Sequence, residues 1–124
     1  MKIFVPHSSN FDFRNELYTP LRNSNLNSEH DFILPQENKR EVITKELIKT
    51  CDLVLAEVSY PSTGQGIELG WASLLDIPIV CIYKEGLKYS PGLRYITGRF
   101  VSYKNPKDMI EKIGKFLESF DNLG

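Results

Sequence analysis

The residues best suited to chemistry lie in one stretch, from Asp52 to Gly70. After an apolar run, the stretch carries two serines, two glycines and one carboxylate: Ser59, Ser62, Gly64, Gly66 and Glu68. Glycines let backbone amides approach a ligand closely, and the start of a helix offers N–H groups to an anion. A phosphate or a sugar hydroxyl would suit this place. A carboxylate beside it is suited to nucleophilic attack on the anomeric carbon of a sugar.

The position of Glu68 admits a second interpretation. The sequence predicts a helix from about Ile67 to Leu75, with Glu68 in its first turn, where an acid commonly complements the helix dipole. We expect Ile67, Trp71, Leu74 and Leu75 to form the buried stripe of this helix, with Glu68 at the edge of the stripe and facing the loops. Spacing alone leaves both roles open.

The elements that must position these residues follow from the alternation of apolar runs with helix-like segments. The sequence predicts strands at 3–5, 31–34, 53–56, 79–83 and 100–103, and helices at 13–22, 41–49, 67–75 and from Asn105-Pro106 onward. Such alternation predicts βαβ units and a parallel sheet. We therefore expect a single α/β domain over residues 1–124, a flavodoxin-like or Rossmann-like three-layer sandwich with a five-stranded parallel sheet.

This topology predicts where a ligand binds. In open parallel sheets, ligands lie beyond the carboxyl ends of the strands, at the point where the strand order reverses. That rule selects three loops, at residues 6–12, 57–66 and 84–98.

The charge and composition of the chain argue against several kinds of binding partner and site. A net charge of −1 and a pI near 6.1 argue against a nucleic-acid partner. Cys51 and Cys81 sit in or beside apolar runs, so we expect reduced core cysteines, and no metal site is predicted. No apolar stretch reaches the roughly 20 residues of a membrane span. Because the chain enters a strand without a signal-like segment, we expect a cytoplasmic protein.

The stretch from Asp52 to Gly70 resembles the corresponding segment of a known family. The run Ala56 to Ser59, then Pro61-Ser62, Gly64 and Gly66, and Glu68-Leu69-Gly70 is similar to the signature of the nucleoside 2-deoxyribosyltransferase superfamily, closest to its 2′-deoxynucleoside 5′-phosphate N-hydrolase branch. The resemblance implies that Glu68 is the nucleophile and forms a covalent glycosyl intermediate. It also implies that Ser62 contacts the 5′-phosphate, and it calls for no cofactor.

The same resemblance implies a homodimer. Members of the family carry a serine in the loop after the fourth strand, which reaches the phosphate in the neighbouring subunit's site. Ser90 stands at about this place, although a serine before Pro91 is equally suited to forming a turn.

Two segments depart from the family's pattern. The first strand is normally followed by Gly-Ser, whereas this chain has Pro6 and His7 followed by Ser8 and Ser9. The two serines could supply the same hydroxyls. His7 could touch a phosphate or base, or be a solvated turn residue.

The second departure concerns acid–base chemistry. The family places an Asp eight residues before the Asp that opens the third strand, and here that position is Thr44. Thr44 could bind the substrate through a hydrogen bond to a sugar hydroxyl. Its own hydroxyl cannot act as an acid or base at neutral pH. Glu41, one helical turn away, could substitute.

Two functions therefore stand side by side. The first is cleavage of the N-glycosidic bond of (deoxy)nucleosides or their 5′-monophosphates, by hydrolysis or base transfer. The alternative, which Thr44 favours, is a nucleotide-binding or sensing module on the same fold with little or no catalysis.

Overall fold

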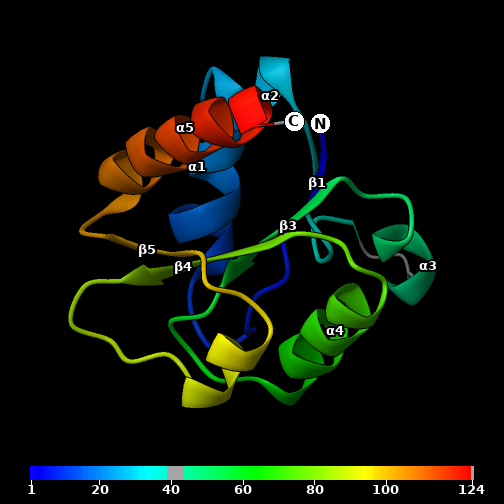
Figure 1. Cartoon of the computed structure of the whole chain (residues 1–124). Helices are drawn as coiled ribbons and strands as arrows, with labels where there is room; N and C mark the ends of the chain where they lie inside the picture. Colours follow the sequence, from blue (N-terminus) through cyan, green and yellow to red (C-terminus); the bar gives the residue numbers. More distant parts are fainter. Residues whose placement is uncertain (39–43, 124) are drawn as a thin grey trace.

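The computed structural model describes residues 1–38 and 44–123 and contains a five-stranded sheet (Figure 1). The strands are β1 (Lys2–Phe4), β2 (Asp31–Ile33), β3 (Leu53–Glu57), β4 (Ile79–Lys84) and β5 (Phe100–Tyr103). All neighbouring strands pair in parallel, in the order β2-β1-β3-β4-β5. The predicted α/β fold is confirmed, and the strand order is the flavodoxin-like one.

Helices cover both faces of this sheet. They are η1 (a π-helix, Arg14–Tyr18), α1 (Thr19–Arg22), α2 (Leu26–Glu29), α3 (Thr44–Ile48), α4 (Thr63–Leu74), η2 (a 3₁₀ helix, Pro91–Tyr95) and α5 (Pro106–Leu123). Figure 1 shows α1, α2 and α5 on one side of the sheet and α3 and α4 on the other.

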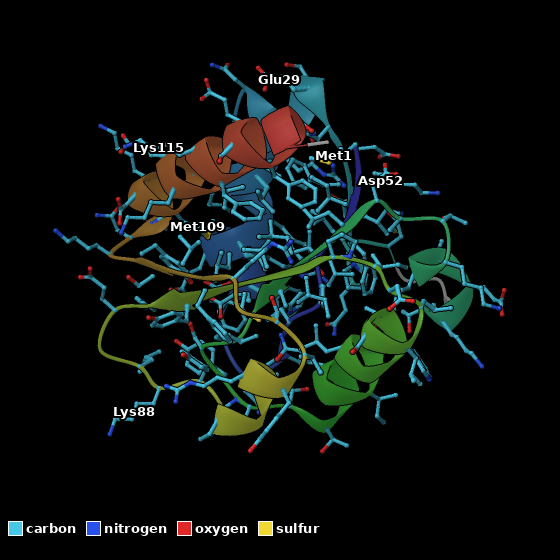
Figure 2. All side chains as sticks on the ribbon, in the orientation of Figure 1. Met1, Glu29, Asp52, Lys88, Met109 and Lys115 are labelled. Atoms are coloured by element: carbon cyan, nitrogen blue, oxygen red, sulfur yellow. The ribbon has the colours of Figure 1, made fainter. Side chains whose placement is uncertain are left out.

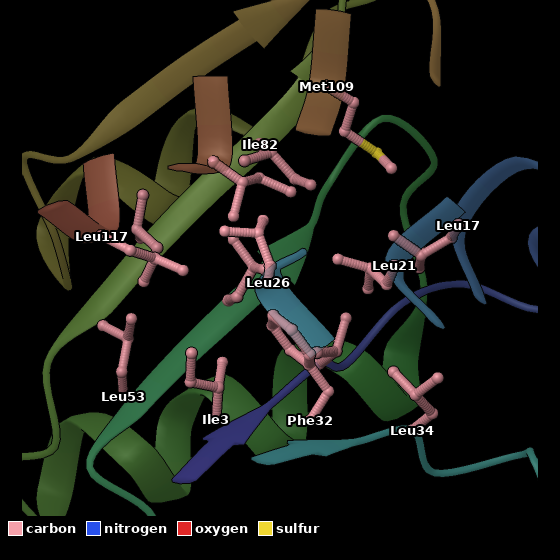
Figure 3. Close-up of a cluster of buried hydrophobic side chains, with 14 of the residues drawn as sticks. Ile3, Leu17, Leu21, Leu26, Phe32, Leu34, Leu53, Ile82, Met109 and Leu117 are labelled. Atoms are coloured by element: carbon pink, nitrogen blue, oxygen red, sulfur yellow. The ribbon is translucent and has the colours of Figure 1, made fainter. Parts of the chain in front are cut away.

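The core beneath α5 forms because apolar residues recur at helical spacing along that helix. Met109, Ile113 and Leu117 are buried in one cluster with Leu53 and Leu55 of β3. Figure 3 labels Met109, Leu117 and Leu53 of this cluster. The predicted start of the helix is also correct. The Asn105 side chain accepts a hydrogen bond from the Asp108 amide at 2.8 Å, and Pro106 is the first helical residue.

A second core lies on the α4 side. Val54 and Ala56 of β3 pack there with Leu69 and Ala72 of α4. All five residues of β3 are buried, which explains the uninterrupted apolar run from Leu53 to Ala56, because a central parallel strand is covered on both faces. Both cysteines are free and buried, as predicted.

Charged side chains are spread over the surface of the molecule. In Figure 2, Glu29 and Lys115 extend outward from α2 and α5, and Lys88 extends from the loop after β4. No helix within residues 1–38 and 44–123 is long and apolar enough to cross a membrane.

The prediction for α4 was wrong in two respects. The helix begins at Thr63 rather than near Ile67, because Ser62 caps it, so Gly64 and Gly66 are helical residues. The predicted buried stripe is also largely exposed: Ile67 is 50% exposed, Leu74 84% and Leu75 39%. The helix instead buries the face that carries Gln65, Leu69 and Ala72. The prediction failed because α4 carries two apolar stripes at the same helical spacing, and spacing does not show which of them faces the sheet.

Other differences from the prediction are small. The helix expected at 13–22 divides at Thr19 into η1 and α1, and Pro20 stands in the first turn of α1, where a missing N–H breaks no bond. The short helix α2 was not predicted. The helix expected at 41–49 is present as α3, while Glu41 and the apolar residues 42 and 43 lie outside the described residues.

Candidate active site

The candidate site lies where β1 and β3 run side by side and their following loops diverge. The loop after β1 leads to η1, and the loop after β3 leads to α4 on the opposite face. His7 and Glu57 continue the parallel pairing as an isolated bridge just beyond the strand ends. Two of the three predicted loops thus flank the reversal point of the sheet, which is the place where this fold binds ligands.

Glu68 is the sixth residue of α4 and stands in the second turn. Its side chain is half-buried, and burial raises the pKa of the carboxyl above its ordinary value. A hydrogen bond from the side chain of Thr44, at the start of α3, acts in the opposite direction. Burial raises the pKa of Tyr18 to about 12, and the charge of Glu68 adds a smaller contribution in the same direction.

The position of Glu68 in α4 argues against a dipole-complementing role. The interaction with the helix dipole falls off beyond the first turn, and α4 has no acidic residue there.

The start of α4 is built around Ser62. Its hydroxyl accepts a hydrogen bond from the Gln65 amide at 3.5 Å, which is long, and its backbone is extended as in other helix caps. A Cβ atom added to Gly64 or Gly66 would meet nothing within 4 Å. Packing inside the chain therefore does not require glycine at these positions, and the bare helical backbone leaves space for a ligand.

Gln65 joins the two loops of the site and was missed by sequence reasoning. Its buried side-chain amide donates to the carbonyl oxygen of Pro6 at 3.2 Å and to that of Glu57 at 2.6 Å. The first turn of α4 is thereby fixed to the ends of both β1 and β3. A glutamine on the helix face that carries Leu69 and Ala72 was the available signal.

Ser59 is buried, at 4% exposure, and its hydroxyl is engaged within the protein. The hydroxyl donates to Glu57 Oε2 at 3.0 Å and accepts from the Lys84 amide at 2.8 Å. A substrate contact of the kind predicted for Ser59 would have to replace one of these bonds.

His7 is also buried, so the prediction of a solvated turn histidine was wrong. Its Nδ1 lies 2.7 Å from the carbonyl oxygen of Ser8, which can only accept, so Nδ1 carries a proton. Burial lowers the pKa of His7, and the neutral ring then accepts at Nε2 from the Tyr18 hydroxyl, 2.6 Å away. The Tyr18 oxygen also accepts from the Gln36 amide at 2.9 Å.

The two serines after His7 differ in exposure. Ser8 is 1% exposed, and its hydroxyl accepts from the Asn10 amide at 3.0 Å, which stabilises the turn. Ser9 is exposed, and its hydroxyl accepts from the Gln36 side chain at 2.9 Å. Of this pair, Ser9 is the hydroxyl that solvent reaches.

Aromatic rings join the loops after β1 and β3, which the sequence gave no reason to expect. Phe11 stacks on Tyr60 with ring centroids 4.9 Å apart and an interplanar angle of 25°. Phe13 lies against His7 at 4.5 Å. The loops after β1 and β3 therefore contact each other through aromatic rings, in addition to the hydrogen bonds that the Gln65 side chain donates to the backbone at both strand ends.

Ser90 lies apart from this constellation, at the start of η2. It is exposed and caps η2 without a side-chain hydrogen bond. Arg94, at the end of η2, lies over the Tyr89 ring at 5.7 Å. Within the described part of the chain, no group of three or more His, Cys, Asp or Glu side chains could hold a metal ion.

Comparison with known proteins adds two sequence relatives, while no family model matches the chain. Both relatives carry the name 2′-deoxynucleoside 5′-phosphate N-hydrolase 1. The one from Thermofilum pendens is 35% identical over 85 residues, which are 63% of this chain and 59% of the relative. The one from Syntrophotalea carbinolica is 46% identical over 39 residues, 32% of this chain and 28% of the relative. The matches thus span less than two thirds of either relative.

Two solved structures share the fold. The CMP N-glycosidase BcmB of Clostridium botulinum matches with a TM-score of 0.67 and 21% identity, over 92% of this chain and 99% of that one. A 2-desoxiribosyltransferase from Leishmania mexicana matches with a TM-score of 0.54 and 15% identity, over 82% and 89%. The chain is thus similar in sequence to proteins named as 2′-deoxynucleoside 5′-phosphate N-hydrolases and shares its fold with a CMP N-glycosidase and a 2-desoxiribosyltransferase of known structure.

Proposed function

We propose that this protein cleaves the N-glycosidic bond of (deoxy)nucleosides or their 5′-monophosphates, with Glu68 as the nucleophile. The observation that carries the proposal is the half-buried Glu68 carboxylate beside Thr44, at the reversal point of the sheet. The names of the relatives and of the structural neighbours support the same class of reaction.

The first chemical step is a displacement at the sugar. A Glu68 carboxylate oxygen attacks the anomeric carbon and forms an ester bond as the carbon–nitrogen bond to the base breaks. The electron pair of the broken bond leaves with the base, whose nitrogen then takes up a proton. Partial burial suits this attack, because a carboxylate with few fixed hydrogen bonds keeps its electron pairs available.

The second step releases the sugar. Water attacks the anomeric carbon and gives up one proton to solvent, the ester bond breaks, and Glu68 returns to its carboxylate form. If a second base attacks in place of water, the result is base transfer. Both outcomes use the same glycosyl intermediate.

The 5′-phosphate fits the start of α4. The first amides of a helix have no intrahelical acceptor, and the helix dipole favours an anion there. Ser62 would add its hydroxyl, which gives up only a long capping bond. The open backbone at Gly64 and Gly66 permits close approach. His7, Ser8 and Ser9 would line the other side of the crevice, where Ser9 offers the exposed hydroxyl.

A second candidate function rests on Thr44. Its hydroxyl reaches Glu68 but cannot protonate a departing base at neutral pH. A nucleotide-binding or sensing module would keep the crevice and lack efficient turnover. A cytoplasmic location, expected from the sequence, is common to both candidates.

Base release tests the proposal. The purified protein is incubated with ribo- and deoxyribonucleosides and their 5′-monophosphates, and free base is separated by chromatography. Wild type and Glu46→Ala, a control at an exposed glutamate of α3, should release base, whereas Glu68→Ala should not. Equal release by wild type and Glu68→Ala would disprove the assignment. A nucleotide that raises the melting temperature but stays intact would favour the sensing module.

We also propose that the protein acts as a homodimer through the exposed stripe of α4. Ile67 and Leu74 are 50% and 84% exposed, and Tyr95 at the end of η2 is 93% exposed. Trp71, on the same stripe, and Leu93 of η2 pack on one core cluster, so α4 and η2 lie on the same side of the molecule. An exposed apolar surface of this kind is typical of a subunit contact. Leu74→Glu should shift the sedimentation of the protein to that of a monomer.

Subunit mixing tests whether Ser90 serves the partner's site. Glu68→Ala and Ser90→Ala proteins are each assayed alone and then after mixing and exchange of subunits. In a mixed dimer, the intact Glu68 of one subunit meets the intact Ser90 of the other. Recovery of activity on monophosphates supports a shared site, whereas no recovery in a proven mixed dimer contradicts it.

A further inference from the structure

One buried acidic residue has no part in the proposed chemistry. Glu57 ends β3 and is 1% exposed. Its neighbour Ala56 packs with α4, whereas Leu55 packs beneath α5. Because side chains alternate along a strand, the Glu57 carboxylate lies on the α5 face of the sheet, opposite to the face that carries α4 and Glu68.

We propose that Glu57 is a positioning residue that fixes the turn leading into α4, and through it the placement of Ser62 and Glu68. The inference rests on the function proposed for Glu68. It specifies which buried group holds the catalytic helix in place.

The first argument is the convergence of donors on the Glu57 carboxylate. Oε1 accepts from the Ser59 amide at 2.6 Å. Oε2 accepts from the Ser59 hydroxyl at 3.0 Å and from the Tyr103 hydroxyl. Because the Ser59 hydroxyl itself accepts from the Lys84 amide, the carboxylate links the carboxyl ends of β3, β4 and β5.

The second argument is the backbone of the same residue. The Glu57 amide donates to the carbonyl oxygen of Pro6 at 3.1 Å, and the Glu57 carbonyl accepts from Gln65 at 2.6 Å. Glu57 therefore connects the carboxyl ends of β1, β3, β4 and β5 with the first turn of α4. Ser59 is three residues from the cap residue Ser62, so a shift of the turn reaches the helix directly.

The geometry also excludes a direct chemical role. The two carboxylate oxygens are taken up by Ser59 and Tyr103, and the side chain is closed to solvent. Glu57 cannot be the acid that Thr44 fails to supply. Burial raises the pKa of Glu57 and the nearby Glu16 adds to this, while the bonds from Tyr103 and Ser59 act against it.

The main test is Glu57→Gln, which keeps the size of the side chain. Glutamine has one accepting oxygen where glutamate has two, so either the two hydroxyls or the Ser59 amide loses its acceptor, and the link between the strands loosens. We expect the turnover number for base release to fall about 10- to 100-fold, because misplacement of a reacting group by about 1 Å has an effect of this size. The KM should change much less, since binding groups at the start of α4 remain present.

A matched control separates positioning from lost stability. Leu117→Ala removes buried side chain from α5 in the core on the same face of the sheet. All variants are assayed well below their melting temperatures. We expect Leu117→Ala to lose as much stability as Glu57→Gln or more and to keep its turnover number. Equal turnover in Glu57→Gln and wild type would overturn the inference.

Further variants guard against a Glu57→Gln protein that does not fold. Tyr103→Phe leaves the carboxylate with both bonds from Ser59 and should give a smaller fall of the same kind. Tyr103→Phe combined with Ser59→Ala should cost less than the sum of the two single changes, because both act on one carboxylate. Strict additivity would contradict a shared link.

Hydrogen exchange gives a readout that does not depend on catalysis. In Glu57→Gln, the amides from Ser59 to Gln65 should exchange faster, while those of β1 and β2 stay unchanged. Unchanged exchange in this turn overturns the positioning role even if the enzyme is active. A wild-type protein that releases no base would disprove the proposed function and leave the exchange result interpretable.

Discussion

Glu57 and Glu68 belong to the same short stretch of sequence, and burial raises the pKa of both, yet their surroundings differ. Glu57 is closed to solvent and receives bonds from two residues that hold it in place. Glu68 is half-buried, and Thr44 is the one hydrogen-bonding partner that affects its pKa among the described residues. The raised pKa therefore does not separate the two roles.

What separates them is the number of fixed donors. A carboxylate surrounded by donors is stabilised where it stands, and its lone pairs are occupied. A carboxylate with one hydrogen-bonding partner, as Glu68 has in Thr44 among the described residues, keeps oxygen atoms that can attack a substrate. We therefore expect hydrogen-bond satisfaction, more than burial, to distinguish the proposed positioning role of Glu57 from the proposed nucleophilic role of Glu68.

The largest expected effect comes from removing each of the two carboxylates in a separate variant. Glu68→Gln should lower base release roughly 10³-fold or more and leave stability unchanged or slightly higher, because it removes a partly buried charge. Glu57→Ala should instead destabilise the fold by about 2–4 kcal/mol, since it leaves buried donors of Ser59 and Tyr103 without an acceptor. Activity assays and urea denaturation check both. Similar losses of stability in the two variants would break the comparison.

A smaller effect is expected from adding a carboxylate beside Glu68. Thr44→Asp places a carboxylate where the family resemblance implies an acid–base group, and it should raise the turnover number about 10-fold or more. The new charge disfavours ionisation of Glu68, so the acidic limb of the pH–activity profile should move to higher pH. Thr50→Asp, which places the same charge at an exposed position after α3, is the control. No gain over that control would show that base departure does not limit turnover.

The smallest expected effect is a change in how the stability of the protein depends on pH when Glu68 is replaced by glutamine. A raised folded-state pKa means that the folded protein holds the Glu68 proton more tightly than the unfolded chain does. The associated stability is present at low pH and is lost as pH rises through the folded-state pKa, above the ordinary value of 4.5. Relative to wild type, Glu68→Gln should therefore gain stability as pH rises from about 4 to 7. Denaturation across this range measures the slope, and an opposite slope would mean a lowered pKa.

Much of the fold could be predicted because buried parallel strands leave a direct trace in the sequence. The run from Leu53 to Ala56 is apolar without alternation, and Asn105-Pro106 marks the start of α5 by local chemistry. The four-residue helix α2 carries no such periodic signal. On α4, two apolar stripes share one spacing, and only packing against the sheet decides that Leu69 and Ala72 are buried rather than Leu74.

The candidate site could be predicted as far as local motifs extend. The resemblance indicated Glu68 and Thr44, and the structure brings the two side chains together. The roles of Gln65, Tyr18 and Tyr103 depend on contacts between residues far apart in the chain, such as Tyr103 and Glu57, 46 positions apart. A single sequence holds no record of such pairs.

The lone tryptophan of the chain, Trp71, stands about one turn after Glu68 on α4 and is half-buried. Its indole is the single strong intrinsic fluorophore of the molecule, and it belongs to the apolar stripe of α4 that we propose as the subunit contact. The emission of the unlabelled protein should therefore report two events, the arrival of a ligand near Glu68 and the covering of α4 by a second subunit. Titration with ligand at fixed protein concentration and dilution without ligand would separate these two signals, so the protein carries its own optical probe.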